Sequence, residues 1–348
     1  MKKRNGLALF GVLAVLLTGC GADEELQARL DAGMTNIENG AYEEALTDFS
    51  EVIQGGELLV EAYRGTGMAY MAMGEYGQAV DAFDQALALT DDRMRETEKD
   101  ILYYKAAAQY QGEDYAGASE TCDQILVLAN EGNAHYIKGA SCMRLGDTST
   151  AKTEFDTAAS LNADDYDMLL DIYECYREQN LSAEGDTYLQ QALNIQGSDG
   201  NTAYQKARIY YYLEEYDKAQ ALLSASADSL DLEGRLLLGE IYLAMDDTDH
   251  ARMTYQSCIE EYGETPQCVN GLVLCDIANG DYASALENAD RGLALDGEEG
   301  KQDLAYNAIV ALEYQGDFDG ALERAASYVE QYPEDEKGQK EYAFLLSR

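Results

Sequence analysis

The residues in this sequence with the chemistry for catalysis or metal binding are seven cysteines and two histidines. His135 and His250 lie far apart in the chain, and no HExxH, CxxC, phosphate-binding glycine loop or nucleophile elbow accompanies them. His250 follows Asp246, Asp247 and Asp249, but this acidic run lacks the spaced ligands and the central glycine of a calcium loop. The sequence therefore predicts no enzyme, no cofactor and no metal site.

Cys20 ends a segment of a different kind. A basic stretch at residues 2–4 is followed by an apolar run at residues 7–17, which is too short to span a bilayer comfortably. The run ends in Leu-Thr-Gly-Cys, and this tetrapeptide resembles the cleavage site of bacterial lipoproteins. The resemblance implies that residues 1–19 are a removed signal peptide, that Cys20 carries a lipid with palmitate-like acyl chains, and that residues 20–22 are a short tether. The alternative is an ordinary signal peptide or membrane anchor that happens to end in cysteine.

The composition is acidic, with 24 lysines and arginines against 66 aspartates and glutamates and a net charge of −42. This excess argues against nucleic acid as a partner and against adsorption to anionic lipid, and it favours protein partners with a basic patch. The alternative is that the charge serves solubility alone. Hydrophobic residues make up 46% of the chain, and the two prolines and the lack of a strand pattern predict a folded, all-helical protein.

A repeated pattern of small and aromatic residues organises the rest of the chain. Residues 61–89 read as two antiparallel helices joined at Gly74, in which Gly67 and Ala79 allow close approach and Phe83 fills the space around them. The pattern recurs with a period near 34 residues, which is typical of a helical solenoid. The small residues equivalent to Ala79 are Ala45, Ala118, Ala151, Gly185, Ala219, Ala251, Ala285 and Ala321.

These residues make the chain similar to the tetratricopeptide repeat family. The resemblance is strengthened by an aromatic residue three positions before most anchors, at Tyr42, Tyr76, Tyr115, Tyr216, Tyr282 and Phe318. It implies an all-α, right-handed superhelical solenoid of about nine helix-turn-helix repeats at residues 23–333, with a capping helix at residues 334–348. The pattern is weakest in the fifth repeat. Residues 91–98 lengthen one connection, as a loop or as an extra helical turn.

In this family the first helices line a concave groove, which implies a binding surface for a protein or peptide. Tyrosine and arginine are enriched at the positions that project into this groove, and both residue types combine contact area with polar groups. The residues predicted to contact a partner are Tyr103, Tyr110, Tyr136, Arg144, Arg177, Tyr204, Arg208, Tyr211 and Tyr212. The alternative is that many of these side chains pack between neighbouring repeats.

Six cysteines follow Cys20, and the sequence leaves open whether they are buried free thiols or form at least one disulfide. Cys268 and Cys275 share a predicted helix and lie too far apart along it to pair. Cys258 could meet one of these two across the interface between the seventh and eighth repeats. The remaining members of the set are Cys122, Cys142 and Cys175.

Together these inferences predict a lipid-anchored scaffold outside the cytoplasm, on the cell membrane or, in a cell with two membranes, on the outer membrane. The scaffold would bind a protein or peptide through its groove and would have no catalytic activity. The alternative function is that of a permanent structural subunit in a cell-envelope assembly or secretion machine.

Overall fold

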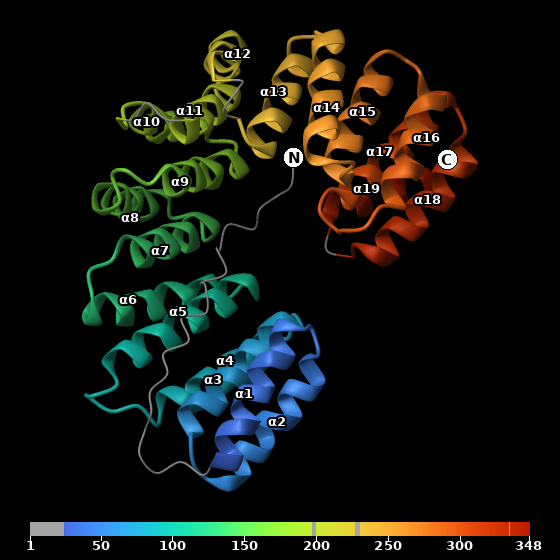
Figure 1. Cartoon of the computed structure of the whole chain (residues 1–348). Coiled ribbons are helices and arrows are strands. Elements are labelled where there is room, and N and C mark those ends of the chain that lie inside the picture. The colour runs from blue at the N-terminus through green and yellow to red at the C-terminus, as the bar shows by residue number, and fades with distance from the viewer. Residues whose placement is uncertain (1–23, 197–199, 227–229, 334) are drawn as a thin grey trace. The chain divides into compact units, whose positions relative to one another are not determined.

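A computed structural model describes residues 24–196, 200–226, 230–333 and 335–348 (Figure 1). These residues form nineteen α-helices and no strand, which confirms the predicted all-α solenoid fold. The predicted signal peptide, the lipidated Cys20 and the tether lie outside the described residues. The chain divides after Ala192 into two compact units, and each is considered by itself.

The N-terminal unit contains five helical hairpins. Their helices are α1 (Glu24–Glu38), α2 (Tyr42–Gly55), α3 (Leu59–Ala72), α4 (Tyr76–Leu87), α5 (Arg95–Gln111), α6 (Tyr115–Leu128), α7 (Gly132–Arg144), α8 (Thr148–Leu161), α9 (Tyr166–Glu178) and α10 (Ser182–Leu193). The C-terminal unit contains four hairpins and one further helix. Their helices are α11 (Gly200–Tyr212), α12 (Tyr216–Ala225), α13 (Leu232–Ala244), α14 (Thr248–Tyr262), α15 (Pro266–Ala278), α16 (Tyr282–Leu293), α17 (Lys301–Gln315), α18 (Phe318–Gln331) and α19 (Glu336–Leu346).

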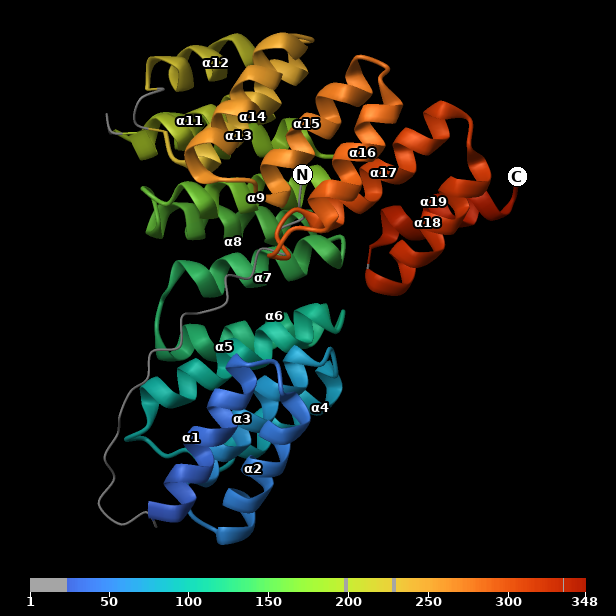
Figure 2. The same cartoon turned by 45° about the vertical axis from the view of Figure 1, so that its right-hand side comes forward.

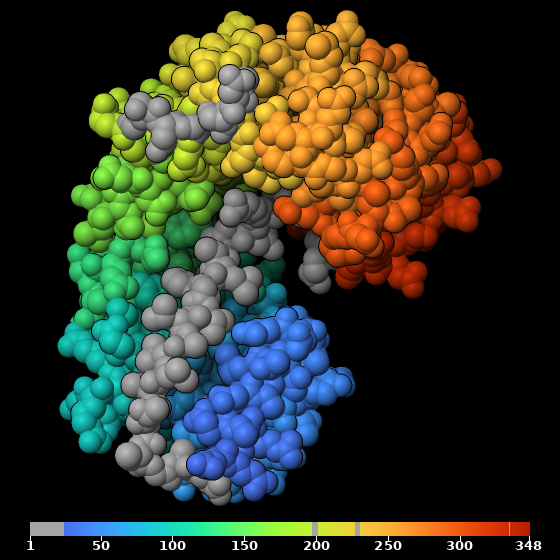
Figure 3. Space-filling model, viewed as in Figure 1, coloured from blue at the N-terminus to red at the C-terminus, as the bar shows by residue number. Residues whose placement is uncertain are grey.

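Successive hairpins stack in the same way within each unit (Figures 1 and 2). The first helices of neighbouring hairpins contact each other, as α3 does with α1 and α5, and α15 does with α13 and α17. The second helices instead pack mainly against first helices, as α4 does with α3 and α5. The first helices therefore form one continuous layer in each unit, and side chains fill the spaces that the cartoon leaves between neighbouring helices (Figure 3).

A left-handed residue ends the first helix of every hairpin, two positions before the second helix begins. At the second hairpin this residue is Gly74, and the next residue, Glu75, donates its N–H to the carbonyl of Tyr70 and so closes the helix end. The equivalent residues elsewhere are Gly40, Glu113, Gly146, Asn180, Glu214, Asp246, Gly280 and Gly316. In five hairpins an aspartate then accepts a backbone N–H at the start of the second helix, and these are Asp114, Asp147, Asp247, Asp281 and Asp317.

The core of a repeat is an aromatic ring laid against glycine. The ring of Phe83 occupies the place of the missing side chain of Gly67, because a Cβ there would lie 2.4 Å from Cε1 of Phe83. Phe49 is enclosed by two glycines, Gly33 and Gly65, one from each of two neighbouring repeats. Glycine therefore lets a helix approach a buried ring, and not only another helix backbone.

The lengthened connection between the second and third repeats has features of both predicted alternatives. A turn is closed by the side chain of Asp91, which accepts hydrogen bonds from the backbone and the guanidinium of Arg93. Helix α5 then begins at Arg95 and runs for 17 residues, the longest helix of the described residues. The inserted residues thus form a turn and lengthen α5.

The last helix, α19, covers the end of the C-terminal unit. Leu345 is buried in a cluster with Leu312 and Tyr328, and Tyr342 packs against the same cluster. Within the part of the chain that the structure describes, no helix has both the length and the apolar character needed to cross a membrane.

Candidate functional site

Arg144, at the end of α7, holds together side chains from three consecutive repeats. Its Nε donates to the hydroxyl of Tyr115 on α6 over 3.1 Å, and its guanidinium carbon lies 5.4 Å from the centre of that ring. A second nitrogen of the guanidinium donates to Glu178, the last residue of α9, over 3.2 Å. Tyr110, near the end of α5, meets the ring of Tyr115 edge-on at 5.3 Å. We call these four residues the Arg144 cluster.

The electrostatics of the Arg144 cluster favour a fixed, charged guanidinium and a neutral phenol at Tyr110. The hydrogen bond with Tyr115 raises the pKa of Arg144, and burial raises the pKa of the Tyr110 hydroxyl well above its usual value. The side chain of Arg144 is 37% exposed and that of Glu178 is 41% exposed. The cluster therefore presents to solvent a guanidinium held in place from two sides, with aromatic rings beside it.

Tyr136 and Cys175 lie next to each other on α7 and α9, with the Tyr136 hydroxyl 4.0 Å from the Cys175 sulfur. Burial raises the pKa of both groups, that of Cys175 to about 12. The ring of Tyr136 also packs against Phe155, with ring centres 6.2 Å apart. A protonated thiol and a neutral phenol in this setting are packing groups and not nucleophiles.

Arg64 on α3 makes contacts similar to those of Arg144, with an acidic residue and a tyrosine ring. Its Nε lies 2.6 Å from a carboxylate oxygen of Asp100 on α5, and its guanidinium carbon lies 5.4 Å from the ring centre of Tyr104. Burial raises the pKa of Asp100. Arginine and acid are thus paired between neighbouring first helices at two places in the N-terminal unit.

Four of the predicted contact residues, Tyr204, Arg208, Tyr211 and Tyr212, lie on α11 in the C-terminal unit. Arg208 donates to the side chain of Gln205 over 2.6 Å, and its guanidinium carbon lies 5.7 Å from the ring centre of Tyr204. Tyr204 and Tyr211 pack against the buried core of this unit, and burial raises the pKa of Tyr211 to about 12. Two of the four predicted contacts therefore also hold their repeat together.

Two hairpins match a known repeat directly. Residues 60–93, which cover α4 and all but the first residue of α3, match the tetratricopeptide repeat. Residues 233–265, which cover α14 and all but the first residue of α13, match it too. The chain is a tetratricopeptide repeat protein. One matched repeat lies in each unit, and the other hairpins also have a left-handed residue between their two helices.

Solved structures with a similar fold include other proteins of this kind. Yeast Tom70 is 14% identical, with 92% of this chain and 88% of that chain covered and a TM-score of 0.48. A tetratricopeptide repeat protein from Parabacteroides merdae is 14% identical, with 73% and 99% covered and a TM-score of 0.45. MamA from Desulfovibrio magneticus RS-1 is 16% identical, with 50% and 96% covered and a TM-score of 0.42. No curated protein matches the chain.

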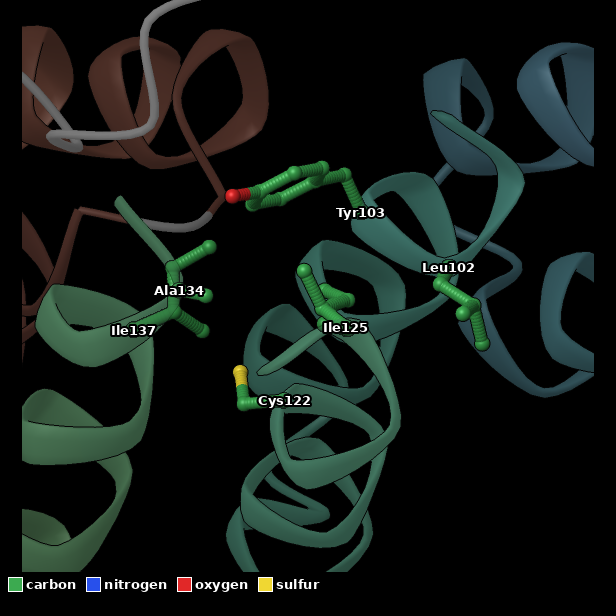
Figure 4. Packing of buried hydrophobic residues seen from close by; sticks show 7 residues of the cluster. Leu102, Tyr103, Cys122, Ile125, Ala134 and Ile137 are labelled. Carbon is green, nitrogen blue, oxygen red and sulfur yellow. The ribbon is translucent and has the colours of Figure 1, made fainter. Parts of the chain in front are cut away.

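Tyr103 is placed differently from the other predicted contacts of this tetratricopeptide repeat protein. Its ring lies between α5 and α7, near Ala134 and Ile137 (Figure 4), and only 8% of its surface is exposed. Its hydroxyl donates to Glu131 over 2.8 Å, and Lys99 contacts the same carboxylate at 2.7 Å. Tyr103 therefore offers a partner little surface, and we leave it out of the proposed binding surface.

Arg177 lies on α9, one residue before Glu178 of the Arg144 cluster. Its Nε donates to Glu174 on the same helix over 2.8 Å, and its side chain is 48% exposed. Of the predicted residues, the structure thus brings together Tyr110 and Arg144, with Arg177 next to their partner Glu178 in the sequence.

The pairing of Arg144 with Glu178 and of Arg64 with Asp100 was not predicted from the sequence. The signal was available, because the residues of each pair are separated by about one repeat, 34 positions for Arg144 and Glu178. Residues one period apart occupy equivalent positions on neighbouring first helices. Opposite charges at that spacing therefore indicate an ion pair between repeats.

Both histidines have structural contacts. His135 lies 2.5 Å from Glu154 and 2.9 Å from Asn130. His250 contacts the capping residue Asp247 at 2.7 Å and stacks on Tyr242 at 5.3 Å. Among the residues that the structure describes, no three or more His, Cys, Asp or Glu side chains converge as metal ligands.

Proposed function

We propose that this tetratricopeptide repeat protein is a scaffold that binds a protein or peptide partner through the Arg144 cluster. The observation that carries the proposal is the partly exposed guanidinium of Arg144, fixed by Tyr115 and Glu178 beside two tyrosine rings of the preceding repeat. Tyrosine and arginine dominate binding hot spots because each buries a large area and keeps a polar end. This cluster offers both on one surface.

Preorganisation supports the same conclusion. Ordering a free arginine side chain on binding costs roughly 0.5–1.5 kcal/mol, and a side chain that is already held avoids most of that cost. The guanidinium of Arg144 donates to the Tyr115 hydroxyl on one side and to the Glu178 carboxylate on the other, over 3.1 and 3.2 Å. A carbonyl or carboxylate of the partner can exchange with these contacts without a new conformation of the arginine.

The surrounding charge sets the kind of partner. The net charge of −42 attracts basic segments, so the proposed partner presents a basic patch around the group that meets Arg144. Long-range attraction of this kind raises the association rate and is screened by salt. Capture of the partner should therefore weaken as the salt concentration rises.

We propose further that the protein is a lipoprotein outside the cytoplasm, anchored through Cys20. The support is the sequence Leu17 to Cys20 after an apolar run, followed by a helix that begins at Glu24. Two or three acyl chains hold a protein firmly on a membrane, because each buried methylene contributes about 0.8 kcal/mol. The repeats would then act close to the membrane surface.

The binding proposal is tested with the full chain carrying a C-terminal affinity tag, crosslinked in envelope extract of its own cells and analysed by mass spectrometry. Arg144→Ala removes the central side chain, and Arg93→Ala is the matched control because it deletes an equal charge at a site that is 89% exposed. We expect Arg93→Ala to capture the native partner and Arg144→Ala to lose about tenfold, the effect of a hot-spot residue. Equal capture by both variants, at unchanged helix content, would overturn the proposal.

A second outcome would favour a different function. If both variants retain one partner at fixed stoichiometry in high salt, the protein is a permanent subunit of an envelope assembly. The lipoprotein proposal has its own test, metabolic labelling with an alkyne fatty acid in a bacterial host. Label on the native chain that is lost in Cys20→Ala supports it, and an unlabelled native chain contradicts it.

A further inference from the structure

Two buried thiols of neighbouring repeats meet in the C-terminal unit. Cys258 is on α14, the second helix of one repeat, and Cys268 is on α15, the first helix of the next. Both side chains are fully buried, and the two thiols hydrogen-bond to each other. The contact therefore joins the seventh and eighth repeats in their shared core.

The surroundings of Cys268 favour its thiolate. The residue lies in the first turn of α15, two positions after Pro266, and its backbone N–H donates to the Thr265 hydroxyl over 3.3 Å. The hydrogen bond from Cys258, together with Thr265, lowers the pKa of Cys268 to about 7, while the same hydrogen bond and burial raise the pKa of Cys258. A helix N-terminus and a neighbouring thiol are the usual setting of a nucleophilic cysteine.

The other described cysteines have different neighbours. Cys275 is on the same helix as Cys268, and burial raises its pKa to about 11. Cys142 faces the hydroxyl of Ser119, and Cys175 faces that of Tyr136, each at 4.0 Å. Burial also keeps the thiol of Cys122 protonated by raising its pKa to about 12. Among the cysteines that the structure describes, only Cys258 and Cys268 have each other as hydrogen-bond partner.

We propose that Cys258 and Cys268 form an intramolecular disulfide that cross-links the two repeats. The oxidant is a small-molecule or protein disulfide. The Cys268 thiolate attacks one sulfur of that disulfide, a mixed disulfide forms, and one thiolate leaves. Cys258 then loses its proton and attacks the Cys268 sulfur, and the second thiolate leaves. In total the two cysteines give up two protons and two electrons, and one external disulfide becomes two thiols.

The buried position sets when this reaction takes place. Because neither sulfur is exposed, the external disulfide reaches the pair while α14 and α15 are assembling or during local opening of the unit. Once closed, the bond links the last turn of α14 to the first turn of α15, across the connection at residues 263–265, and lies inside the interface between the two repeats. In a solenoid each repeat is stabilised by its neighbours, so the bond should stabilise both.

The test uses the full chain, unfolded and refolded with oxidised glutathione, then denatured, alkylated without reduction and digested. We expect one linked peptide pair that joins Cys258 to Cys268, with two hydrogens fewer than the reduced pair. Cys275→Ala is the matched control on α15 and should retain the link, whereas Cys258→Ala should lose it. Full alkylation of Cys258 and Cys268 in the native chain, or links to other cysteines in their place, would overturn the proposal.

Thermal unfolding gives an independent measurement on the same samples. A disulfide constrains the unfolded chain, so the oxidised native protein should unfold a few degrees higher than the reduced one. Cys268→Ala should unfold at the same temperature with and without oxidant. An oxidised native chain that melts no higher than the reduced chain would show that the cross-link does not stabilise the folded repeats. These outcomes are independent of whether the Arg144 cluster binds a partner.

Discussion

Gly67→Ala tests the packing that defines a repeat. A methyl group at this position would lie 2.4 Å from Cε1 of Phe83 and 2.7 Å from two other atoms of the ring. Phe83 is fully buried and stacks on Tyr104 with ring centres 5.9 Å apart, so moving the ring displaces a second aromatic side chain. Overfilling a packed core costs about 1–3 kcal/mol, and the better helix propensity of alanine returns up to about 1 kcal/mol. We expect a net loss of about 1–2 kcal/mol.

Gly77→Ala supplies the matched control in the same hairpin. Gly77 is in α4, and no atom lies within 4 Å of the position that a Cβ would occupy. The same chemical change therefore adds helix propensity without crowding and should stabilise the protein by up to about 1 kcal/mol. The two variants are expected to shift stability in opposite directions.

The assay is urea unfolding followed by circular dichroism, together with hydrogen exchange of the amides in α3 and α4. Exchange is needed because a long repeat array can unfold in parts, and a single midpoint then mixes several transitions. Adding Phe83→Leu to Gly67→Ala should recover part of the loss, since the smaller side chain relieves the clash. A Gly67→Ala variant as stable as the native chain, or a Gly77→Ala variant equally destabilised, would refute the reasoning.

Three further predictions concern other parts of the fold. Glu113→Gly should raise stability in urea unfolding by about 0.5–1 kcal/mol, because the native residue is held at φ 63°, and an unchanged midpoint would contradict this. Arg252→Ala should cost about 3 kcal/mol in the same assay, since it removes the cation paired at 2.6 Å with Asp276, which is 3% exposed, and leaves the neutral amide of Asn288 as its partner; a loss below about 1 kcal/mol would count against it. Burial and the neighbouring Glu341 raise the pKa of Glu313 from its ordinary 4.5 to about 7. The protonated Glu313 side chain therefore contributes fully to the free energy of unfolding below pH 4.5, and this contribution is lost as the pH rises to 7. Glu341→Gln should therefore flatten the pH dependence of thermal unfolding between pH 4.5 and 7, and an unaltered profile would exclude the pair as its source.

The repeat period predicted the hairpins because small and aromatic residues recur wherever helices must approach closely. Gly67 and Phe83 could be assigned to one core in this way, and the structure confirms that they meet. The turns were less predictable, because Glu113, Glu214 and Asp246 adopt the left-handed conformation that glycine adopts elsewhere. Glutamate carries no turn signal and a single aspartate is only a weak one, so the position of these residues in the period is what identifies them.

The repeat period also explains why the candidate site was predicted only in part. The period assigns a residue to the inner face of a helix, but it does not say whether the next repeat covers that residue. Tyr103 lies in the middle of α5, where Glu131, just before α7, accepts its hydroxyl hydrogen bond. Arg144 is the last residue of α7, beyond the packed part of the helix, and keeps its guanidinium partly exposed. Position along the helix therefore separates packing residues from surface residues.

The acidity of the chain is only partly a consequence of the fold. Eight aspartates accept a backbone N–H at the start of a helix in the described part of the chain, and these are Asp114, Asp147, Asp165, Asp231, Asp247, Asp281, Asp317 and Asp335. Asparagine caps a helix about as well as aspartate, so the cap requires the oxygen and not the charge. Acidic residues also outnumber the lysines and arginines that could pair with them, by 66 to 24. This excess of negative charge is therefore permitted by the fold and not required by it, which leaves solubility or attraction of a basic partner as its cause. Replacing capping aspartates with asparagine lowers the charge at constant fold, and only the second cause predicts that partner capture then becomes weaker and less sensitive to salt.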